Sequence, residues 1–186
     1  MKRSRAALLA TISLAAMLFA ARPPADAARE RRFFSVRAGV GVEAPPGWTL
    51  SLHTGYPKIL CLLVHPGGSR MSLAVDDAVT ATDAPALVAQ SRPALTAQGI
   101  EVNAVTAGPR GAVQVDARAT RRNQQLRQLY IVRTVPWGRQ AIVLTLTTTP
   151  ADAAGALGSL EWAAAHLDLQ APVRPDDKHP TLDGGS

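Results

Sequence analysis

Three alternating segments followed by a helical pattern, within residues 112–167, constrain the fold more than any other feature. Residues 112–121 alternate strictly between apolar and polar side chains, which is typical of an antiparallel strand with one buried face. Residues 126–135 and 140–148 continue the pattern and predict a three-stranded meander. Residues 150–167 predict a closing helix. This stretch supplies packing residues and contains no recognisable catalytic motif.

A two-residue turn at Trp137 and Gly138 would set the register of the second and third strands. The predicted opposite pairs are Leu129 with Leu146 and Ile131 with Leu144. The other face of these two strands is also largely apolar, with Tyr130, Val132, Val143 and Thr145. We therefore expect other elements of the chain to cover both faces of the sheet at least in part.

The loop within residues 121–125 decides how the first meander strand faces the second. Val113 and Val115 share a face with Leu129 and Ile131 only if this loop holds an odd number of residues or a bulge. A clean loop of two or four residues would place the two pairs on opposite faces.

Residues 33–107 predict further strands. Residues 33–43 predict one strand, interrupted near Gly39 and Gly41 because glycine weakens a strand. Its apolar positions are expected to share one face: Phe34, Val36, Val40 and Val42. Shorter apolar runs bounded by turn residues predict strands at 48–53, 59–65, 70–76 and 101–107.

Two helices are predicted. Asp83 is a suitable N-cap for the first, Gly99 ends it, and Pro93 is expected to kink or split it. Its expected buried stripe is Leu87, Val88, Ser91 and Leu95. In the closing helix, Gly155 and Gly158 each lower the stability of the helix by about 1 kcal/mol relative to alanine, so tertiary contacts must stabilise it.

The N-terminal segment has the layout of a secretory signal peptide. A basic start is followed by an apolar run over residues 6–21 and by small residues around Ala27. We predict a signal peptide at 1–27, a single domain at 28–169 and a disordered tail at 170–186, because the tail is rich in Pro, Asp and Gly. The protein is thus expected to be periplasmic or secreted. Membrane contact is expected only if the signal stays uncleaved.

Much of the basic charge belongs to the predicted signal peptide. Removing residues 1–27 takes away four of the 20 basic and one of the 14 acidic residues, so the formal net charge falls from +6 to +3, sixteen basic against thirteen acidic. The remaining charge favours no particular partner strongly. Export and the low aromatic content argue against nucleic acid as a partner.

Several patterns together resemble the PsbP-like superfamily. They are V-E-A-P-P-G-W at 42–48, L-Y-I-V-R at 129–133, I-V-L-T-L-T at 142–147, and the helix that Pro150 opens. The resemblance implies an α+β fold in which helices cover a mostly antiparallel sheet as an α/β/α sandwich. The superfamily includes extrinsic photosystem subunits, a nuclear-transport GTPase-binding protein and small exported bacterial proteins. It has no shared catalytic residues, so the resemblance suggests an accessory or binding role.

No motif predicts a catalytic, cofactor or metal site. The four histidines are scattered one per element, and the sequence contains no C-x-x-C and no G-x-S-x-G. The single cysteine, Cys61, lies in an apolar segment, so we expect a buried structural thiol. We therefore predict no cofactor.

Arginines around the predicted meander are the candidates for partner binding. They are Arg118, Arg121, Arg122 and Arg127 at one end, with Arg139 near Trp137 at the other end. Guanidinium groups could bind a carboxylate, a phosphate or a lipid headgroup. Alternatively, the arginines only keep a sheet edge solvated. Trp137, and also Trp162, could be exposed contact residues or could be folded back over a neighbour.

The preferred hypothesis is an exported, non-catalytic domain that binds an unknown protein or envelope component through an open sheet face and hairpin loops. The alternative is a small hydrolase or lipid-handling enzyme whose site is assembled from dispersed residues. A cleft that gathers His53 or His65 with a carboxylate and a hydroxyl would favour the enzyme. A continuous exposed patch around Trp137 and the arginines would favour binding.

Overall fold

The structure, a computed structural model, describes residues 31–52, 56, 58–76, 79, 83–135, 137 and 140–171. The predicted signal peptide and all but the first two residues of the predicted tail lie outside this part of the chain. The described residues form two sheets, two α-helices and a short 3-10 helix, η2 (Pro109–Gly111).

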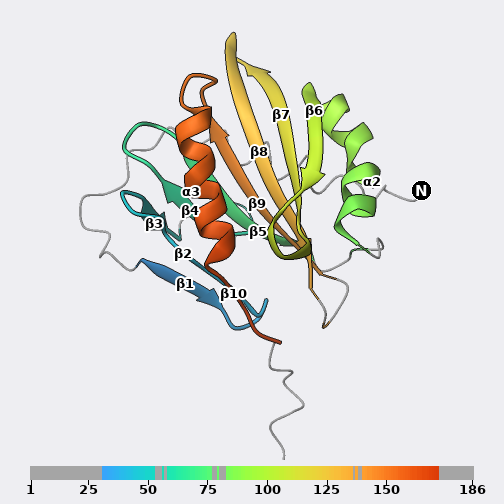
Figure 1. The fold of residues 1–186 in the computed structure, drawn as a ribbon. Helices are drawn as coiled ribbons and strands as arrows, with labels where there is room; N and C mark the ends of the chain where they lie inside the picture. Colours follow the sequence, from blue (N-terminus) through green and yellow to red (C-terminus); the bar gives the residue numbers. More distant parts are fainter. Residues whose placement is uncertain are drawn as a thin grey trace, which may run out of the picture.

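The larger sheet has seven strands, all antiparallel to their neighbours (Figure 1). Its strands are β3 (Thr49–Ser51), β4 (Ile59–Val64), β5 (Arg70–Asp76), β6 (Ile100–Ala107), β7 (Val113–Arg121), β8 (Gln124–Thr134) and β9 (Ala141–Thr148). Their order across the sheet is β3-β4-β5-β9-β8-β7-β6. The three predicted meander strands are therefore confirmed as β7, β8 and β9, which lie next to one another between β6 and β5.

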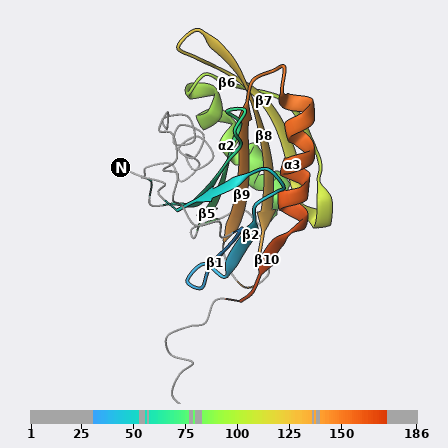
Figure 2. The same ribbon diagram turned by 90° about the vertical axis from the view of Figure 1, so that its left-hand side faces the viewer.

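The two helices pack on opposite faces of the larger sheet. Figure 2 shows α2 (Ala84–Ala97) on one side of the strands and α3 (Ala153–Ala165) on the other. A second sheet of three strands, β1 (Arg32–Ser35), β2 (Val40–Glu43) and β10 (Leu167–Leu169), lies at the lower end of α3 in Figure 1. The predicted α+β fold, with helices on both faces of an antiparallel sheet, is confirmed.

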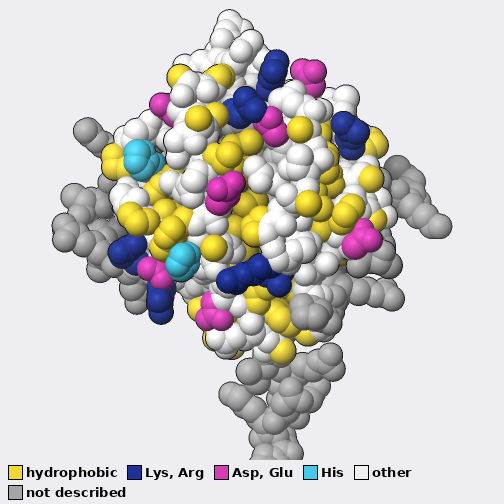
Figure 3. Space-filling view, in the orientation of Figure 1, with side chains coloured by type: hydrophobic (Ala, Val, Ile, Leu, Met, Phe, Trp, Pro, Cys, Tyr) yellow, Lys and Arg dark blue, Asp and Glu magenta, His cyan; other side chains and the backbone are white. Residues whose placement is uncertain are grey.

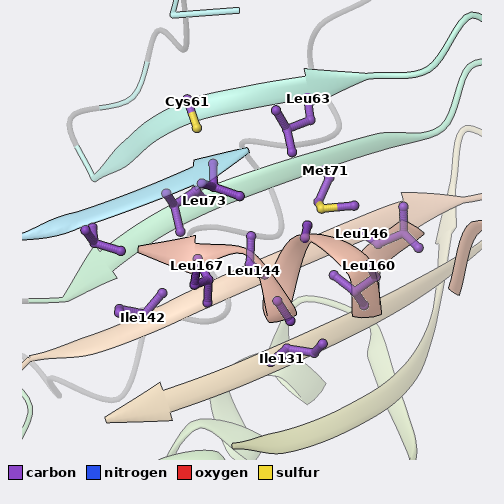
Figure 4. Packing of buried hydrophobic residues seen from close by; sticks show 14 of the residues in the cluster. Cys61, Leu63, Met71, Leu73, Ile131, Ile142, Leu144, Leu146, Leu160 and Leu167 are labelled. Carbon is purple, nitrogen blue, oxygen red and sulfur yellow. The ribbon is translucent and has the colours of Figure 1, made fainter. Parts of the chain in front are cut away.

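The core on the α3 side is built from long aliphatic side chains of adjacent strands. Leu63, Met71 and Leu144 are fully buried there, and Leu160 of α3 packs onto them (Figure 4). Val40 and Val42 of the small sheet belong to the same cluster. Removing such side chains from water is the main stabilising contribution to a domain of this size.

The core on the α2 side is smaller and mixed with polar groups. Leu87, Val88 and Leu95 of α2 pack there against the sheet, as the predicted stripe requires. Beside them, Ser72 and Thr145 are fully buried, and their hydroxyl groups have no hydrogen-bond partner among the described residues. The expectation of apolar cover on both faces of the sheet is confirmed.

The register of the meander is confirmed between β8 and β9, where Leu129 pairs with Leu146 and Ile131 with Leu144. Between β7 and β8, Arg121 pairs with Gln124, so the loop holds two residues. Val113 and Val115 therefore lie on the α2 side, opposite to Leu129 and Ile131. Of the two predicted possibilities, the clean two-residue loop is the one found.

The single strand predicted at 33–43 is wrong. The chain forms a hairpin of β1 and β2 instead, and Gly39 permits the reversal because its φ is +64°. Val40 and Val42 are buried, whereas Phe34 and Val36 are exposed, so the expected common face does not exist.

Pro93 was expected to kink or split the first helix, and the split is wrong, because α2 runs continuously from Ala84 to Ala97. Proline removes the hydrogen bond to the carbonyl four residues earlier, that of Ala89. Both Pro93 and Ala89 are exposed, so water can satisfy that carbonyl.

The predicted N-cap at Asp83 is confirmed, since its carboxylate accepts a hydrogen bond from the backbone N–H of Ala86 at 2.8 Å. Gly99 follows the helix with a φ of +72°.

The closing helix is shorter than predicted and is followed by a strand that the sequence did not reveal. Helix α3 ends at Ala165, and β10 pairs with β2 so that Leu167 lies opposite Val42. The alanine-rich helical pattern runs on into a strand of only three residues, which is too short for its own periodicity to be recognised.

Candidate functional site

Four of the candidate arginines lie at the turn end of the β7–β8 hairpin. Two residues, Arg122 and Asn123, form its turn with φ values of +47° and +62°, as a type I′ turn requires. This register places Arg118 directly opposite Arg127 on the same face of the sheet. We call the group Arg118, Arg121, Arg122 and Arg127 the hairpin arginines.

Two of the hairpin arginines already have partners within the fold. The guanidinium of Arg127 forms a two-pronged ion pair with the carboxylate of Asp116. The hydrogen bond to Asp116 raises the pKa of Arg127, burial lowers it, and the charge of Asp116 raises it further. Arg121 donates to the carbonyl oxygen of Gln98, after helix α2, at 3.0 Å. The ion pair therefore joins the two strands of the hairpin, and the bond to Gln98 ties the hairpin to the segment between α2 and β6.

The other two hairpin arginines are exposed. Arg118 and Arg122 form no hydrogen bond or ion pair with the described residues, so their guanidinium donors are open to a partner. Arg118 also lines a hollow of about 300 Å³ together with Glu101, Thr120, Gln125, Arg127 and Pro150. Because α3 crosses the sheet beside this region, the outer part of β6, β7 and β8 is uncovered on that side (Figure 1).

The hairpin region is basic only to a moderate degree. Four arginines against Asp116 and Glu101 leave a local charge of +2. Figure 3 shows that Lys and Arg side chains on the α3 side lie in several separate places, most with an acidic side chain nearby. A broad basic patch is not visible on this face.

Neither tryptophan stands free at a contact surface. Trp137 is half-buried, packs against the α3-side core, and has a buried indole N–H without a partner among the described residues. It is thus folded back over its neighbours. Arg139, the predicted arginine near Trp137, lies outside the described residues, so the continuous exposed patch stays a prediction. Trp162 stacks on His166, with ring centroids 3.7 Å apart.

A second hollow, of about 340 Å³, lies between α3 and the β4–β5 turn. It was not predicted, because its residues come from three distant parts of the sequence. We call it the imidazole hollow; its lining includes Trp48, His65, Ser69, Asp152, Gly155 and Ser159. Figure 3 shows histidine side chains at the surface on this side of the molecule.

The polar groups of the imidazole hollow bond mainly to their local surroundings. The backbone N–H of Gly67 donates to Nδ1 of His65 at 3.1 Å, and the indole N–H of Trp48 donates to the hydroxyl of Ser159 at 3.1 Å. The hydroxyl groups of Ser69 and Thr148 bond to each other at 2.8 Å. Among the described residues, no hydrogen bond joins the imidazole of His65 to a serine hydroxyl or a carboxylate; the backbone N–H of His65 donates to the carbonyl oxygen of Ser69 at 2.9 Å.

This arrangement differs from a serine-hydrolase triad. In a triad, the histidine donates through one ring nitrogen to a carboxylate and accepts the serine proton through the other. In His65, Nδ1 accepts a hydrogen bond from a backbone N–H, so neutral His65 carries its proton on Nε2. Nε2 then has no lone pair with which to take a proton from serine.

The described residues offer little other reactive chemistry. They contain no group of three or more His, Cys, Asp or Glu side chains placed to hold a metal ion. Within the same part of the chain, no helix is both long and apolar enough to cross a membrane. Cys61 is buried as expected, and burial raises the pKa of its thiol to about 12.

Comparison with known proteins identifies the fold. The sequence matches no protein-family model and no curated protein. The solution structure of CyanoP, the cyanobacterial PsbP of Synechocystis sp. PCC 6803, superposes with a TM-score of 0.55 at 15% sequence identity, covering 75% of this chain and 91% of CyanoP. The fold is PsbP-like.

Two further structures share the PsbP-like fold. The Ran-binding protein Mog1p of Saccharomyces cerevisiae gives a TM-score of 0.53 at 10% identity, with 74% of this chain and 94% of Mog1p covered. LpqN, described as involved in cell envelope biogenesis of Mycobacterium tuberculosis, gives 0.51 at 13% identity, with 71% and 83% covered. The predicted resemblance to the PsbP-like superfamily is therefore confirmed at the level of the fold.

Proposed function

We propose that this PsbP-like protein is a non-catalytic binding or accessory domain of the cell envelope. Its partner, a protein or another envelope component, is contacted by the hairpin arginines. The fold supports a binding role, because the similar structures include a Ran-binding protein and a protein involved in cell envelope biogenesis. The N-terminal signal layout supports export.

The observation that carries this proposal is the different bonding of the four hairpin arginines. Arg121 and Arg127 are engaged within the fold, whereas Arg118 and Arg122 project unpaired from the same hairpin. A guanidinium group pairs best with carboxylate or phosphate oxygens in a bidentate geometry. The partner is therefore expected to present acidic groups to the uncovered face of β7 and β8.

A crosslinked pull-down from the envelope of the native cell tests the proposal. Charge reversal by Arg118→Glu with Arg122→Glu should abolish capture of a partner that the wild-type protein retains. Arg121 is unsuitable for this test, because its substitution would also break the bond to Gln98. The matched control is Arg37→Glu with Arg92→Glu, which makes the same change in net charge at exposed sites elsewhere. Equal capture by both double variants would exclude the hairpin arginines.

N-terminal sequencing of the exported protein tests the location. A mature chain that begins near Ala28 would support cleavage of the signal peptide and an envelope or secreted protein. Recovery of the full-length chain in the membrane fraction would instead show that the segment remains as an anchor.

The enzyme alternative has one observation in its favour. The imidazole hollow gathers His65, Asp152 and two serines from distant segments. The hydrogen bond to Nδ1 of His65 counts against it. Hydrolysis of short- and long-chain p-nitrophenyl esters by purified protein tests this alternative, with His65→Ala as control. Turnover that disappears in the variant would favour the enzyme, and equal background rates would exclude it for these substrates.

A further inference from the structure

The imidazole hollow presents a mixed set of hydrogen-bonding groups without using all of them. Because Nδ1 of His65 accepts from Gly67, neutral His65 has an Nε2–H donor to spare. The hydroxyl of Ser159 accepts from Trp48 and retains its own proton for donation. Asp152 accepts through Oδ2 from Thr149 at 2.7 Å, which leaves Oδ1 as an acceptor.

The unused donors and acceptor of the hollow favour some classes of ligand over others. The lining contains a carboxylate and no lysine or arginine, so an anionic ligand is disfavoured. A purely apolar ligand would leave the donors and the acceptor unpaired, which is costly when water is displaced. A hydroxyl group can both donate and accept, so a ligand with several neighbouring hydroxyls matches the whole set.

One stripe at the start of α3 lines the hollow. It consists of Asp152, the N-cap residue that precedes the helix, and of Gly155 and Ser159 within it. These residues are spaced by three and four positions, so they lie on the same side of the helix. A Cβ atom added to Gly155 would meet no atom within 4 Å. Neighbouring side chains therefore give no reason for glycine at this position, although glycine costs about 1 kcal/mol relative to alanine in a helix.

We infer that the imidazole hollow binds a neutral sugar residue, with the indole of Trp48 in its wall. Its volume of about 340 Å³ is at the lower end of the range for small-ligand pockets, which suits a single sugar ring. The sugar could be free or could be one unit of a glycan. This inference does not depend on the hairpin arginines, which lie outside the lining of the hollow.

Titration of the protein that comprises residues 28–186 with sugars tests the inference. The readout is the NMR chemical shift of the indole N–H of Trp48. The probes are D-glucose, D-galactose and N-acetyl-D-glucosamine, and a linear tetrasaccharide of each. Saturable shifts with monosaccharides would indicate recognition of a free sugar or a chain end. Shifts with tetrasaccharides alone would indicate a glycan chain. No saturable shift with any of the six would overturn the inference, and so would stronger binding of inorganic phosphate.

Gly155→Ala and Gly158→Ala provide a matched pair of variants. Both remove a glycine from α3, and neither new Cβ meets an atom within 4 Å, so both variants should fold. Only Gly155 lines the hollow. Gly155→Ala should weaken sugar binding at least tenfold, and Gly158→Ala should leave it unchanged. Equal affinity of the two variants would place the sugar elsewhere and overturn the inference.

Discussion

At the residue scale, the thiol of Cys61 shows how burial controls chemistry in this domain. Desolvation raises its pKa and a backbone hydrogen bond with Leu73 lowers it by a smaller amount, so that together they move the pKa from 9.0 to about 12. The thiolate is the reactive form of cysteine. The folded protein therefore offers no nucleophile at this position, as the apolar sequence around Cys61 predicts.

A thiol reagent should modify Cys61 at pH 8 only after unfolding. Ellman's reagent, with and without denaturant, measures the rate of modification, and equal rates would contradict the burial.

The raised pKa of Cys61 also predicts how stability depends on pH. Because the thiol keeps its proton to a higher pH in the folded state than in the unfolded state, its contribution to the free energy of unfolding is complete below pH 9 and is lost as the pH rises toward about 12. Compared with Cys61→Ala, the wild type should lose stability more steeply in this range.

Two threonines of β9 should respond oppositely to replacement by valine. The hydroxyl of Thr145 is fully buried and lacks a partner among the described residues, whereas that of Thr148 bonds to Ser69 at 2.8 Å. An unpaired buried hydroxyl is destabilising by about 1 kcal/mol or more. Thr145→Val should therefore raise the free energy of unfolding by about 1 kcal/mol, and Thr148→Val should lower it by a similar amount. Chemical denaturation measures both, and a loss at Thr145 equal to that at Thr148 would be evidence that its hydroxyl is bonded.

The separate roles of the hairpin arginines could be predicted only in part. The sequence places them together, but the partner of Arg127 depends on the two-residue turn, which brings Asp116 within reach across the strands. The partner of Arg121 is a backbone carbonyl after α2, far along the chain. Such contacts leave no signature in the local sequence pattern, because they depend on the relative placement of elements.

At the element scale, strands with strong alternation were predicted well and short or bent elements were not. The bounds of β5 and the register of β8 with β9 follow directly from apolar patterning and turn length. The β1–β2 hairpin was missed because its alternation continues across the reversal at Gly39. Helix α2 survives Pro93 because the affected positions are exposed, which the sequence alone does not reveal.

The turn between β7 and β8 has residues that its backbone does not favour. Both Arg122 and Asn123 have positive φ, and a type I′ turn prefers Asn followed by Gly. The double substitution Arg122→Asn with Asn123→Gly should raise the free energy of unfolding by about 1 kcal/mol, since it relieves the left-handed conformation of arginine. Thermal unfolding measures the change, and the same double variant removes the Arg122 charge without disturbing the hairpin. A lower melting temperature would contradict this account of the turn.

At the scale of the whole molecule, the sequence predicts the class of fold but not its surface hollows. The α+β sandwich follows from the order of strands and helices and from apolar residues on both sheet faces. The imidazole hollow joins Trp48, His65 and residues of α3, and its two extremes in the sequence, Trp48 and Ser159, lie 111 positions apart. Only the packing of α3 against the β4–β5 turn brings them together.

The segment 28–169 should fold as an independent domain. All the helices and strands that the structure describes lie within it, and both helix-covered faces of the sheet are complete there. A protein limited to these residues should show one cooperative thermal transition at the same temperature as the protein that also carries residues 170–186. Circular dichroism measures this, and a broad or strongly lowered transition would show that the tail contributes to the fold.

The pairing of β10 with β2 links the start of the domain to its end. Strand β2 has β1 on one edge, and its other edge is filled only when residues 167–169 arrive. The smaller sheet can therefore close only after residues 167–169 have left the ribosome, whereas the β7–β8 hairpin can form once residue 134 has emerged. Completion of the smaller sheet is thus a late event in the folding of the newly made chain.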